Sequence, residues 1–312
     1  MTAPIFIAGD WGTSRLRLYL CEGDQVIGRK TGPGAVGPHE PHEAILFSLI
    51  EPWLAQHPGA PVVFCGMVGS RNGWVEAPYA PCPAGVQDLG RLLVRFDARG
   101  TEVAIVPGVV GASPRGAPDV MRGEETQIIG VLAKAPELRR GRHLLAHPGT
   151  HTKWAVVEDG RITGFQTALT GEMFALLRDY GTLARVGGDG AAGGGDGFAQ
   201  GLVRHEQAGR PGLLHELFEV RSRQLIDGWD PAFALDFLSG LLIAADVEGA
   251  IAQFGEDVND VVLVGDPLLT ERYRQALDRR EARSRSLSGE DCALAGLAAI
   301  LDSSKGADHV AR

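Results

Sequence analysis

The chain has 312 residues, of which 44% are hydrophobic and 22% are charged, and its formal net charge is −9. This composition is ordinary for a soluble globular protein, and the length suits two domains. The acidic balance argues against a nucleic-acid partner and against binding to an anionic membrane surface. No apolar run approaches the length of a membrane span, and the N-terminus lacks the basic start of a signal peptide. We therefore expect a cytoplasmic protein with reduced thiols at its scattered cysteines, Cys21, Cys65, Cys82 and Cys292.

The first half of the chain predicts alternating strands and helices. Leucines that alternate with polar or aromatic residues over 16–20 are typical of a half-buried strand, and apolar residues at helical spacing over 40–56 predict a helix. The loop over 67–79 is rich in Gly, Arg, Trp and Tyr, which are residue types of small-ligand sites. In order, the expected strands are 5–8, 16–20, 26–29, 61–65 and 102–106, and the expected helices are 40–56 and 123–133.

The second half repeats this order of elements. We expect strands over 143–146, 152–157, 161–165 and 261–265, and helices over 172–180, 213–225, 233–254, from about 268, and over 294–301. The stretch 186–197 predicts a mobile loop, because its many glycines add backbone freedom. It contains a GxGxxG pattern at 188–193, but no strand leads directly into it, as a dinucleotide site would require.

One short pattern occurs twice. Gly12-Thr13 and Gly149-Thr150 are separated by 137 residues, and the same separation relates Gly23 to Gly160 at the next turn. Each copy lies between two apolar runs, so both predict hairpins with a Gly-Thr tip. Glycine admits close approach of a ligand, and turn amides together with a threonine hydroxyl can bind phosphate oxygens. The alternative is a pair of unrelated surface hairpins, because Gly-Thr is a common turn pair.

An aspartate, Asp10, precedes only the first copy. Carboxylates hold Mg²⁺ on a nucleotide, usually through water, so Asp10 is our candidate metal ligand. The alternative is a turn aspartate that bonds to its own backbone. Two such hairpins facing each other would hold a polyphosphate from both sides.

Each half presents three strands, a helix, a strand and a helix, which indicates an α/β fold with mixed sheets. Two such lobes around a central cleft would form the actin-like ATPase (ribonuclease H-like) fold of the actin, hexokinase and Hsp70 superfamily. We expect an N-terminal lobe over 1–142, joined by a C-terminal helix over 288–302, and a C-terminal lobe over 143–287.

Six motifs follow one another in the chain: Asp10-Trp11-Gly12-Thr13, Gly66-Met67-Val68-Gly69-Ser70, Val120-Met121-Arg122-Gly123-Glu124-Glu125-Thr126-Gln127, Pro148-Gly149-Thr150-His151-Thr152-Lys153-Trp154, Thr170-Gly171-Glu172 and Leu238-Ser239-Gly240-Leu241-Leu242. Together they closely resemble the 2-dehydro-3-deoxygalactonokinase family of bacterial sugar-acid kinases, over nearly the whole chain. The resemblance implies phosphorylation of the 6-hydroxyl of 2-dehydro-3-deoxy-D-galactonate in D-galactonate breakdown, with ATP and Mg²⁺. His147, where an apolar residue is expected, and the glycine-rich loop depart from the pattern.

The nucleotide is expected to contact both hairpins. Gly265 follows a buried strand and suits close passage of an adenine ring, although an ordinary strand-to-helix turn would also explain it. The candidate nucleotide-binding residues are Gly12, Thr13, Ser14, Gly149, Thr150, His151, Lys153 and Gly265.

Phosphoryl transfer needs a carboxylate that orients or deprotonates the acceptor hydroxyl. Glu124 and Glu125 open a helix between the two halves, and neighbours on a helix point about 100° apart, so only one can face a site squarely. We favour Glu125, with Glu172 as the next candidate. The alternative for either glutamate is a favourable interaction with the helix dipole.

A sugar acid brings a carboxylate, which arginine can bind with two parallel hydrogen bonds. Arg71 and Arg122 are the best candidates, and Arg15 and Lys153 are nearer the expected phosphates. A solvated surface charge or packing against the protein is the alternative for each substrate candidate. The candidate substrate-binding residues are Ser70, Arg71, Trp74, Glu76, Tyr79, Arg122 and Glu172.

Other functions remain open at this point. A phosphatase acting on polyphosphate or guanosine phosphates would share the fold, but the net charge of −9 disfavours its basic channel. A non-catalytic, nucleotide-gated sugar sensor is a reading from a different class of protein. The sequence does not distinguish the galacto from the gluco epimer of the substrate, and it leaves open whether the chain forms a homodimer.

Overall fold

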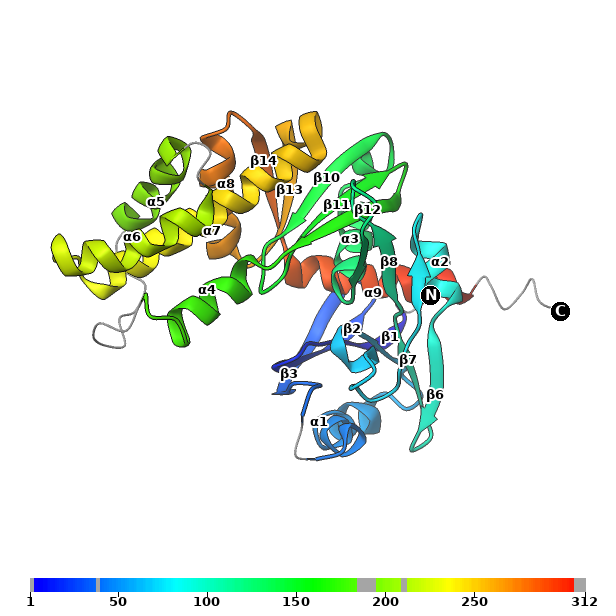
Figure 1. Cartoon of the computed structure of the whole chain (residues 1–312). Coiled ribbons are helices and arrows are strands. Elements are labelled where there is room, and N and C mark those ends of the chain that lie inside the picture. The colour runs from blue at the N-terminus through cyan, green and yellow to red at the C-terminus, as the bar shows by residue number, and fades with distance from the viewer. Residues whose placement is uncertain (1–2, 38–39, 184–194, 209–211, 306–312) are drawn as a thin grey trace. The chain divides into compact units, whose positions relative to one another are not determined.

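The computed structural model describes residues 3–37, 40–183, 195–208 and 212–305 (Figure 1). The chain divides into two compact units. The first comprises Met1–His143, Ala155–Phe165 and Leu287–Arg312, and the second comprises Leu144–Trp154 and Gln166–Ser286. Within the described ranges, no helix is both long enough and apolar enough to cross a bilayer.

The main sheet of the first unit has the strand order β3-β2-β1-β4-β7-β6. Strand β1 is antiparallel to β2 and parallel to β4, so β1 and β4 end at the same edge of the sheet. Helix α1 (His42–Gln56) covers the sheet through a buried face that includes Leu46 and Ile50. The strands are β1 (Ile5–Trp11), β2 (Arg15–Glu22), β3 (Gln25–Pro33), β4 (Val62–Cys65), β6 (Val94–Ala98) and β7 (Thr101–Ile105).

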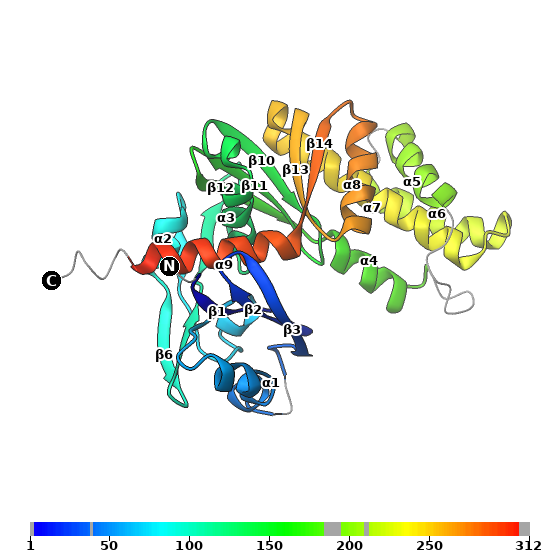
Figure 2. The same ribbon diagram turned by 180° about the vertical axis from the view of Figure 1, so that it is seen from behind.

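Helices α3 (Glu124–Lys134) and α9 (Gly289–Lys305) cross closely in the same unit. A Cβ built on Gly130 would lie 1.7 Å from the carbonyl oxygen of Cys292, and one built on Gly296 would lie 1.9 Å from that of Thr126. Only glycine permits this approach of two backbones. Figure 2 shows α9, the end of the chain, running beside α3 and the first strands. The smaller elements here are η1 (Met67–Gly69), β5 (Tyr79–Pro81), α2 (Val86–Arg91), β8 (Gly108–Ala112), β9 (Pro118–Met121) and η2 (Pro136–Arg139).

The second large sheet has the strand order β12-β11-β10-β13-β14. Its β10 is parallel to β13, as β1 is parallel to β4 in the first sheet. The division between units passes through β11 and β12, because Ala155–Phe165 is grouped with the first unit. The strands are β10 (Arg142–His147), β11 (Thr152–Glu158), β12 (Arg161–Ala168), β13 (Asp260–Gly265) and β14 (Arg283–Ser288).

Helices make up most of the second unit. Helices α5 and α7 cross at Gly201 and Gly240, where a Cβ on either residue would lie 2.9 Å from the Cα of the other. Most of the loop predicted over 186–197, with its GxGxxG pattern, lies outside the described residues, but the prediction of loop over 195–197 was wrong because α5 begins there. The helices are α4 (Thr170–Asp179), α5 (Gly195–Ala208), α6 (Leu213–Ile226), α7 (Pro231–Phe254), η3 (Gly255–Asn259) and α8 (Pro267–Asp278).

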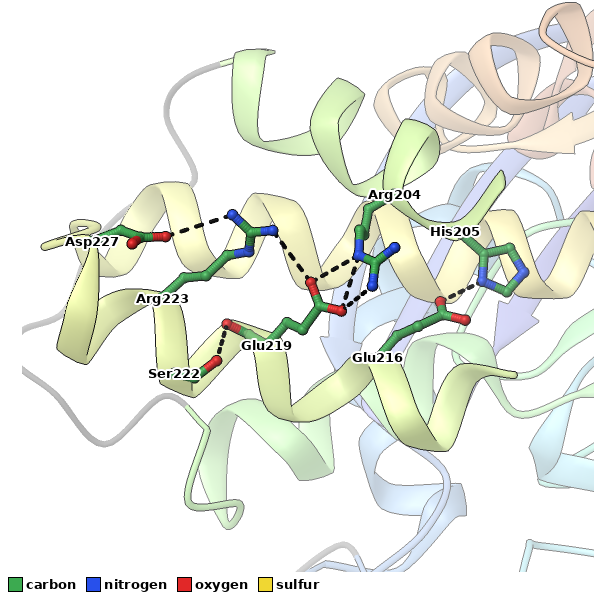
Figure 3. A network of polar contacts seen from close by, with 7 residues as sticks. All are labelled: Arg204, His205, Glu216, Glu219, Ser222, Arg223 and Asp227. Carbon is green, nitrogen blue, oxygen red and sulfur yellow. Dashed lines mark hydrogen bonds and ion pairs between the residues drawn. The ribbon is translucent and has the colours of Figure 1, made fainter. Parts of the chain in front are cut away.

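Ion pairs fasten α5 to α6, as Figure 3 shows. The Arg204 guanidinium donates hydrogen bonds to both carboxylate oxygens of Glu219, at 2.5 to 2.9 Å. The buried His205 ring lies between two carboxylates, with Nδ1 2.6 Å from Glu216 and Nε2 2.7 Å from Glu248. These two contacts link His205 of α5 to α6 through Glu216 and to α7 through Glu248. These contacts fix the helices against α7.

Candidate functional site

The first hairpin, hairpin 1 (residues 10–15), connects β1 to β2 in the first unit. The Gly12 N–H donates a 3.0 Å hydrogen bond to the carbonyl oxygen of Arg15, which closes the turn. Thr13 and Ser14 are exposed at the tip. Asp10 and Arg17 are register partners, and their side chains form an ion pair of 3.1 Å. The tip therefore offers backbone and hydroxyl groups to solvent, with one carboxylate behind it.

At hairpin 1, the position that has no room for a side chain is Gly34, which lies outside the Gly12-Thr13 motif. A Cβ built on Gly34 would lie only 1.9 Å from the carbonyl oxygen of Thr13, so this position must be glycine. A Cβ on Gly12 would meet nothing closer than the carbonyl oxygen of Arg15 at 3.6 Å. The protein thus leaves room beside Gly12, and phosphate oxygens could occupy that room beside the turn amides.

Asp10 lies at the edge where β1 and β4 end. Burial raises its pKa, and Arg17 opposes that rise through its charge and its hydrogen bond. The Asp10 side chain is nevertheless 23% exposed, so solvent can reach the carboxylate. Gly66, with a φ of 93°, follows β4, and a Cβ there would lie 3.5 Å from Asp10 Oδ1. One such carboxylate can hold Mg²⁺ together with water and substrate phosphates. Within the described part of the chain, no three metal-ligating side chains gather around one point.

Glu125, at the start of α3, is fully buried. Its Oε2 accepts a hydrogen bond from the Gly123 N–H at 2.7 Å, and its Oε1 accepts one from the Thr126 hydroxyl at 2.9 Å. Burial, followed by the charge of Glu124, raises the pKa of Glu125 to about 7. Glu124 is only partly buried and accepts a hydrogen bond from the Arg122 N–H at 3.2 Å. Glu125 therefore has the pKa that suits proton transfer near neutral pH, whereas Glu124 is the more exposed of the two.

The structure brings Asp10 and the start of α3 to the same edge of the sheet. Asp10 pairs in register with Cys65, the last residue of β4. A Cβ built on Gly123 would lie 3.4 Å from the Cα of Gly66, the next residue. Burial raises the pKa of the Cys65 thiol, and the charges of Asp10 and Glu125 raise it further. The candidate metal ligand and the candidate base thus belong to one local site in the first unit.

Arg122 has the most distinctive environment of the arginines named from the sequence. Its guanidinium lies 4.4 Å above the centre of the Tyr79 ring, and Nη2 donates a 2.8 Å hydrogen bond to the carbonyl oxygen of Ala77. Within the described ranges, its buried Nε and Nη1 atoms have no hydrogen-bond partner, and neither does the buried hydroxyl of Ser70. Buried donors without partners cost stability, so such groups commonly await a ligand.

The other residues of the predicted sugar loop have different settings. Arg71 and Glu76 are exposed. Trp74 packs edge-on against Trp11 and Phe96, with ring centres 6.3 and 5.0 Å apart respectively. This is the packing role that the sequence left open for Trp74. Arg122, Tyr79 and Ser70 are therefore better placed than Trp74 to contact a ligand.

The second hairpin, hairpin 2 (residues 147–152), belongs to the second unit and rests on the start of α4. A Cβ on Gly171 would lie 2.3 Å from the carbonyl oxygen of Gly149, whereas one on Gly149 would meet only the carbonyl oxygen of His151 at 4.0 Å. The Glu172 N–H donates a 2.8 Å hydrogen bond to the carbonyl oxygen of Thr150. His151 and Glu172 are side-chain partners, with Nε2 2.5 Å from Oε2, and both are about half exposed.

Two buried polar residues flank this tip. Lys153 donates a 2.8 Å hydrogen bond to the Thr167 hydroxyl, so its ammonium group lies inside the second unit and not at the surface. His147 is 4% exposed, and neither ring nitrogen has a hydrogen-bond partner among the described residues. Burial, helped by the charge of Lys153, lowers the pKa of His147 to about 3. His147 is therefore neutral at physiological pH.

A pocket of about 310 Å³ opens beside hairpin 2, entirely within the second unit. Gly149, Gly171 and Tyr273 line one part of it. Another part carries a polar chain, because Arg272 donates to Asp236 at 2.6 Å and to the Ser239 hydroxyl at 2.7 Å. Gly265 is not a lining residue, but the next residue, Asp266, is. The pocket's remaining lining residues are Thr170, Phe174, Arg178, Leu235, Leu242, Ile243, Leu268 and Leu269.

The internal repeat extends further than the two Gly-Thr pairs. Gly34 and Gly171, the glycines that support the two tips, are also 137 residues apart. Asp10 and His147 share that separation, at the ends of the equivalent strands β1 and β10. The sequence placed Gly171 in a motif but did not reveal that Gly34 and Gly171 support the two tips, although extending the same offset would have paired them. Sequence analysis also missed Asp236 and Arg272, for which no local pattern gives a signal.

The comparisons with known proteins agree over almost the whole chain. A family model described as 2-keto-3-deoxy-galactonokinase matches residues 10–300. A protein of Rhizobium meliloti named as a probable 2-dehydro-3-deoxygalactonokinase, DgoK1, is 34% identical over 311 residues, which cover 96% of this chain and 97% of that protein. The 2-dehydro-3-deoxygalactonokinase of Escherichia coli is 34% identical over 302 residues, covering 96% of this chain and 98% of that protein.

Solved structures give the same picture of the fold. A crystal structure of a protein from Sinorhizobium meliloti, described as a 2-dehydro-3-deoxygalactonokinase, matches with a TM-score of 0.84 and 33% identity, covering 95% of each chain. The activator of the 2-hydroxyisocaproyl-CoA dehydratase from Clostridium difficile, solved with bound ADPNP, matches with a TM-score of 0.52 and 14% identity over 99% of this chain and 98% of that one. The predicted α/β fold of the actin-like ATPase class is confirmed.

Proposed function

The chain belongs to the 2-keto-3-deoxy-galactonokinase family, and from that premise we propose that it uses ATP to phosphorylate the 6-hydroxyl of 2-dehydro-3-deoxy-D-galactonate. The family predicted from the six motifs is thus confirmed, and the chain is a kinase. The observation that carries the choice of a sugar acid is Arg122. Its buried Nε and Nη1 atoms have no hydrogen-bond partner among the described residues, and a carboxylate, which a neutral sugar lacks, is an acceptor that a guanidinium binds strongly.

The open room beside Gly12 supports a role for hairpin 1 in binding phosphate oxygens of ATP, and the open room beside Gly149 separately supports the same role for hairpin 2. The exposed hydroxyls of Thr13, Ser14 and Thr150 add donors there. The pocket beside hairpin 2 is our proposed site for the adenosine, which we call the nucleotide pocket. Its apolar wall suits a flat ring, and Asp236 and Ser239 can bond to the polar edge of the base. Gly265 does not line the nucleotide pocket, and its proposed role is to form the turn that places the lining residue Asp266.

Asp10 is the residue that would hold Mg²⁺, through water, against the phosphates. The bound ion would neutralise charge on the transferred phosphoryl group. The ion pair with Arg17 uses Asp10 Oδ2 and so leaves Oδ1 outside that pair. The substitution Asp10→Asn removes the charge and little volume, so it should lower kcat by orders of magnitude without unfolding the protein. Turnover close to that of the wild type at saturating Mg²⁺ would exclude this role.

Glu125 stays our proposed general base. It would accept the proton of the 6-hydroxyl as that oxygen bonds to the γ-phosphorus and the bond to the β-phosphate oxygen breaks, so that ADP leaves. Its pKa of about 7 lets it exist as a carboxylate at neutral pH and still hold a proton during transfer. Glu124, the more exposed neighbour, is the alternative that paired substitutions separate.

The remaining parts of the proposal concern organisation. We propose lobes over 1–142 with 288–302 and over 143–287, and a cytoplasmic location, which the four free cysteines support. A homodimer is supported by the exposed apolar side chains of Leu214, Phe218 and Ile226 on α6, which are 84%, 63% and 83% exposed. Light scattering of the purified protein would measure its mass, and a monomer at all concentrations would exclude the dimer.

The central test is release of ADP with a panel of 2-dehydro-3-deoxy-aldonates. We expect turnover with the galacto acid, and the gluco epimer shows how strictly the site selects one hydroxyl configuration. The matched control is the reduced, neutral analogue in which the carboxylate is replaced by an alcohol. It should lose most of kcat/KM, because Arg122 then keeps its unpaired donors. Equal turnover of acid and alcohol would contradict a sugar-acid site.

A further inference from the structure

Asp246, in the middle of α7, receives hydrogen bonds from three other elements of the second unit. Its Oδ1 accepts one from the Trp154 indole N–H on β11 at 2.9 Å. Its Oδ2 accepts one from the Thr170 hydroxyl at the start of α4, at 2.6 Å, and one from the Tyr273 hydroxyl on α8. Asp246 is only 9% exposed. A buried carboxylate with three donors holds those donors in one arrangement, because losing any bond leaves a buried group unsatisfied.

Two of these donors lead directly to hairpin 2. Thr170 precedes Gly171, whose backbone lies against Gly149. The N–H of the following residue, Glu172, donates to the carbonyl oxygen of Thr150. On the other side, the Tyr273 hydroxyl lies 2.8 Å from the hydroxyl of Thr152, the first residue after the tip. The tip is therefore held at both ends by groups that converge on one carboxylate.

We infer that Asp246 is a positioning residue, which sets the hairpin 2 tip against the wall of the nucleotide pocket and thereby sets the affinity for ATP. The inference rests on the proposed function, since it takes ATP to be the pocket's occupant. Thr170 and Tyr273 line the pocket directly, whereas Asp246 acts behind them. A displacement of about 1 Å is enough to weaken contacts between backbone amides and phosphate oxygens.

The first test compares two substitutions with the same number of side-chain heavy atoms and the same branching. Asp246→Leu removes every acceptor, and we expect its dissociation constant and KM for ATP to rise about tenfold or more, as loss of charged hydrogen bonds predicts. Asp246→Asn can still accept from Trp154 and donate to the two hydroxyls, so it should stay within about threefold of the wild type. The KM for the sugar acid should not change, because the candidate carboxylate site belongs to the first unit.

The matched control is Asp230→Ala at the N-cap of the same helix. Asp230 accepts hydrogen bonds from the N–H groups of Ala232 and Phe233, so its loss should lower the melting temperature without changing the affinity for ATP. Should Asp246→Leu fail to fold, Thr170→Val breaks one bond of the network and should raise the dissociation constant for ATP several-fold.

Calorimetric titration of ATP binding separates the possible outcomes. Unchanged ATP affinity in Asp246→Leu or Thr170→Val, with a lowered melting temperature alone, would overturn the inference and leave a purely structural network. Equal increases in both KM values would also overturn it. If the wild type binds ATP but phosphorylates none of the sugar acids, the proposed function fails. The loss of ATP affinity in the variants would still support the role of Asp246.

Discussion

The Gly123 N–H donates a 2.7 Å hydrogen bond to the carboxylate of Glu125, whose side chain is fully buried. Burial and the charge of Glu124 raise the pKa of Glu125 from its ordinary value of 4.5 to about 7. Between these two values the folded protein binds more protons than the unfolded chain, so stability falls as pH rises. The loss should reach roughly 3 kcal/mol and be complete above about pH 7.

Glu125→Gln should abolish this part of the pH dependence, because glutamine does not titrate. Urea unfolding of both proteins between pH 4.5 and 8 measures it, and the stability of the wild type relative to the variant should decline through that window. A difference that stays constant with pH would show that the Glu125 pKa is not raised.

Glu125→Gln should also lose most of kcat while the affinities for ATP and the sugar acid remain, since general-base action contributes about 10²–10⁴-fold. Glu124→Gln should cost far less. Steady-state kinetics of both variants at pH 8 test the ranking. The opposite order would assign the base to Glu124, and two active variants would turn attention to Glu172, which lies beside hairpin 2.

Arg122→Ala should raise the KM for the sugar acid about tenfold to a hundredfold with little change in the KM for ATP, the range expected for a buried, charged hydrogen bond. Arg122→Lys should recover only part of the loss, because an ammonium group lacks the planar pair of donors. Arg71→Ala provides the comparison, since Arg71 is exposed and should matter less. A larger effect at Arg71 would move the carboxylate site to the loop after η1.

His147→Leu should alter stability in acid. The pKa of His147 in the folded protein is about 3, below its ordinary value of 6.5, so the unfolded chain binds the extra proton and stability is lost as pH falls from 6.5. Leucine removes that loss. It also removes two buried nitrogens that have no partner among the described residues, which should raise stability by roughly 1 kcal/mol or more at pH 7.5. Thermal unfolding at pH 5 and 7.5 would reveal both effects. A destabilised variant at both values would indicate that His147 has a partner in solution.

Gly171→Ala should raise the KM for ATP much more than Gly149→Ala does. The added methyl at Gly171 would lie 2.3 Å from the carbonyl oxygen of Gly149 and must displace the hairpin 2 tip, whereas the one at Gly149 has free space in the protein. The comparison also tests the nucleotide site, because a methyl at Gly149 would compete only with a bound phosphate. If neither substitution affects ATP, hairpin 2 does not contact the nucleotide.

Some elements could be predicted from the sequence because their signals are local. Strand β2 alternates between exposed and buried residues only over 15–18 and is buried on both faces over 18–21, and β4 is a continuous apolar run, so the apolar residues of both strands predict their place in the sheet. Strand β14 was not predicted, because its sequence RSRSLS is polar and its place at the edge of the sheet depends on pairing with β13. Helix α5 begins within a glycine-rich stretch, where its contact with α7 replaces the missing helix propensity.

The sequence by itself determined the two Gly-Thr hairpins, the family and the pair of glutamates, since turn chemistry and ordered motifs are carried by neighbouring residues. Only the tertiary structure decided that Gly34 and Gly171 are the positions where a Cβ would clash, and that Glu125 is fully buried while Glu124 is partly buried. It also decided that two nitrogens of Arg122 lack a hydrogen-bond partner among the described residues. Burial and hydrogen-bond satisfaction depend on what packs around a residue from distant parts of the chain, and no local pattern records that.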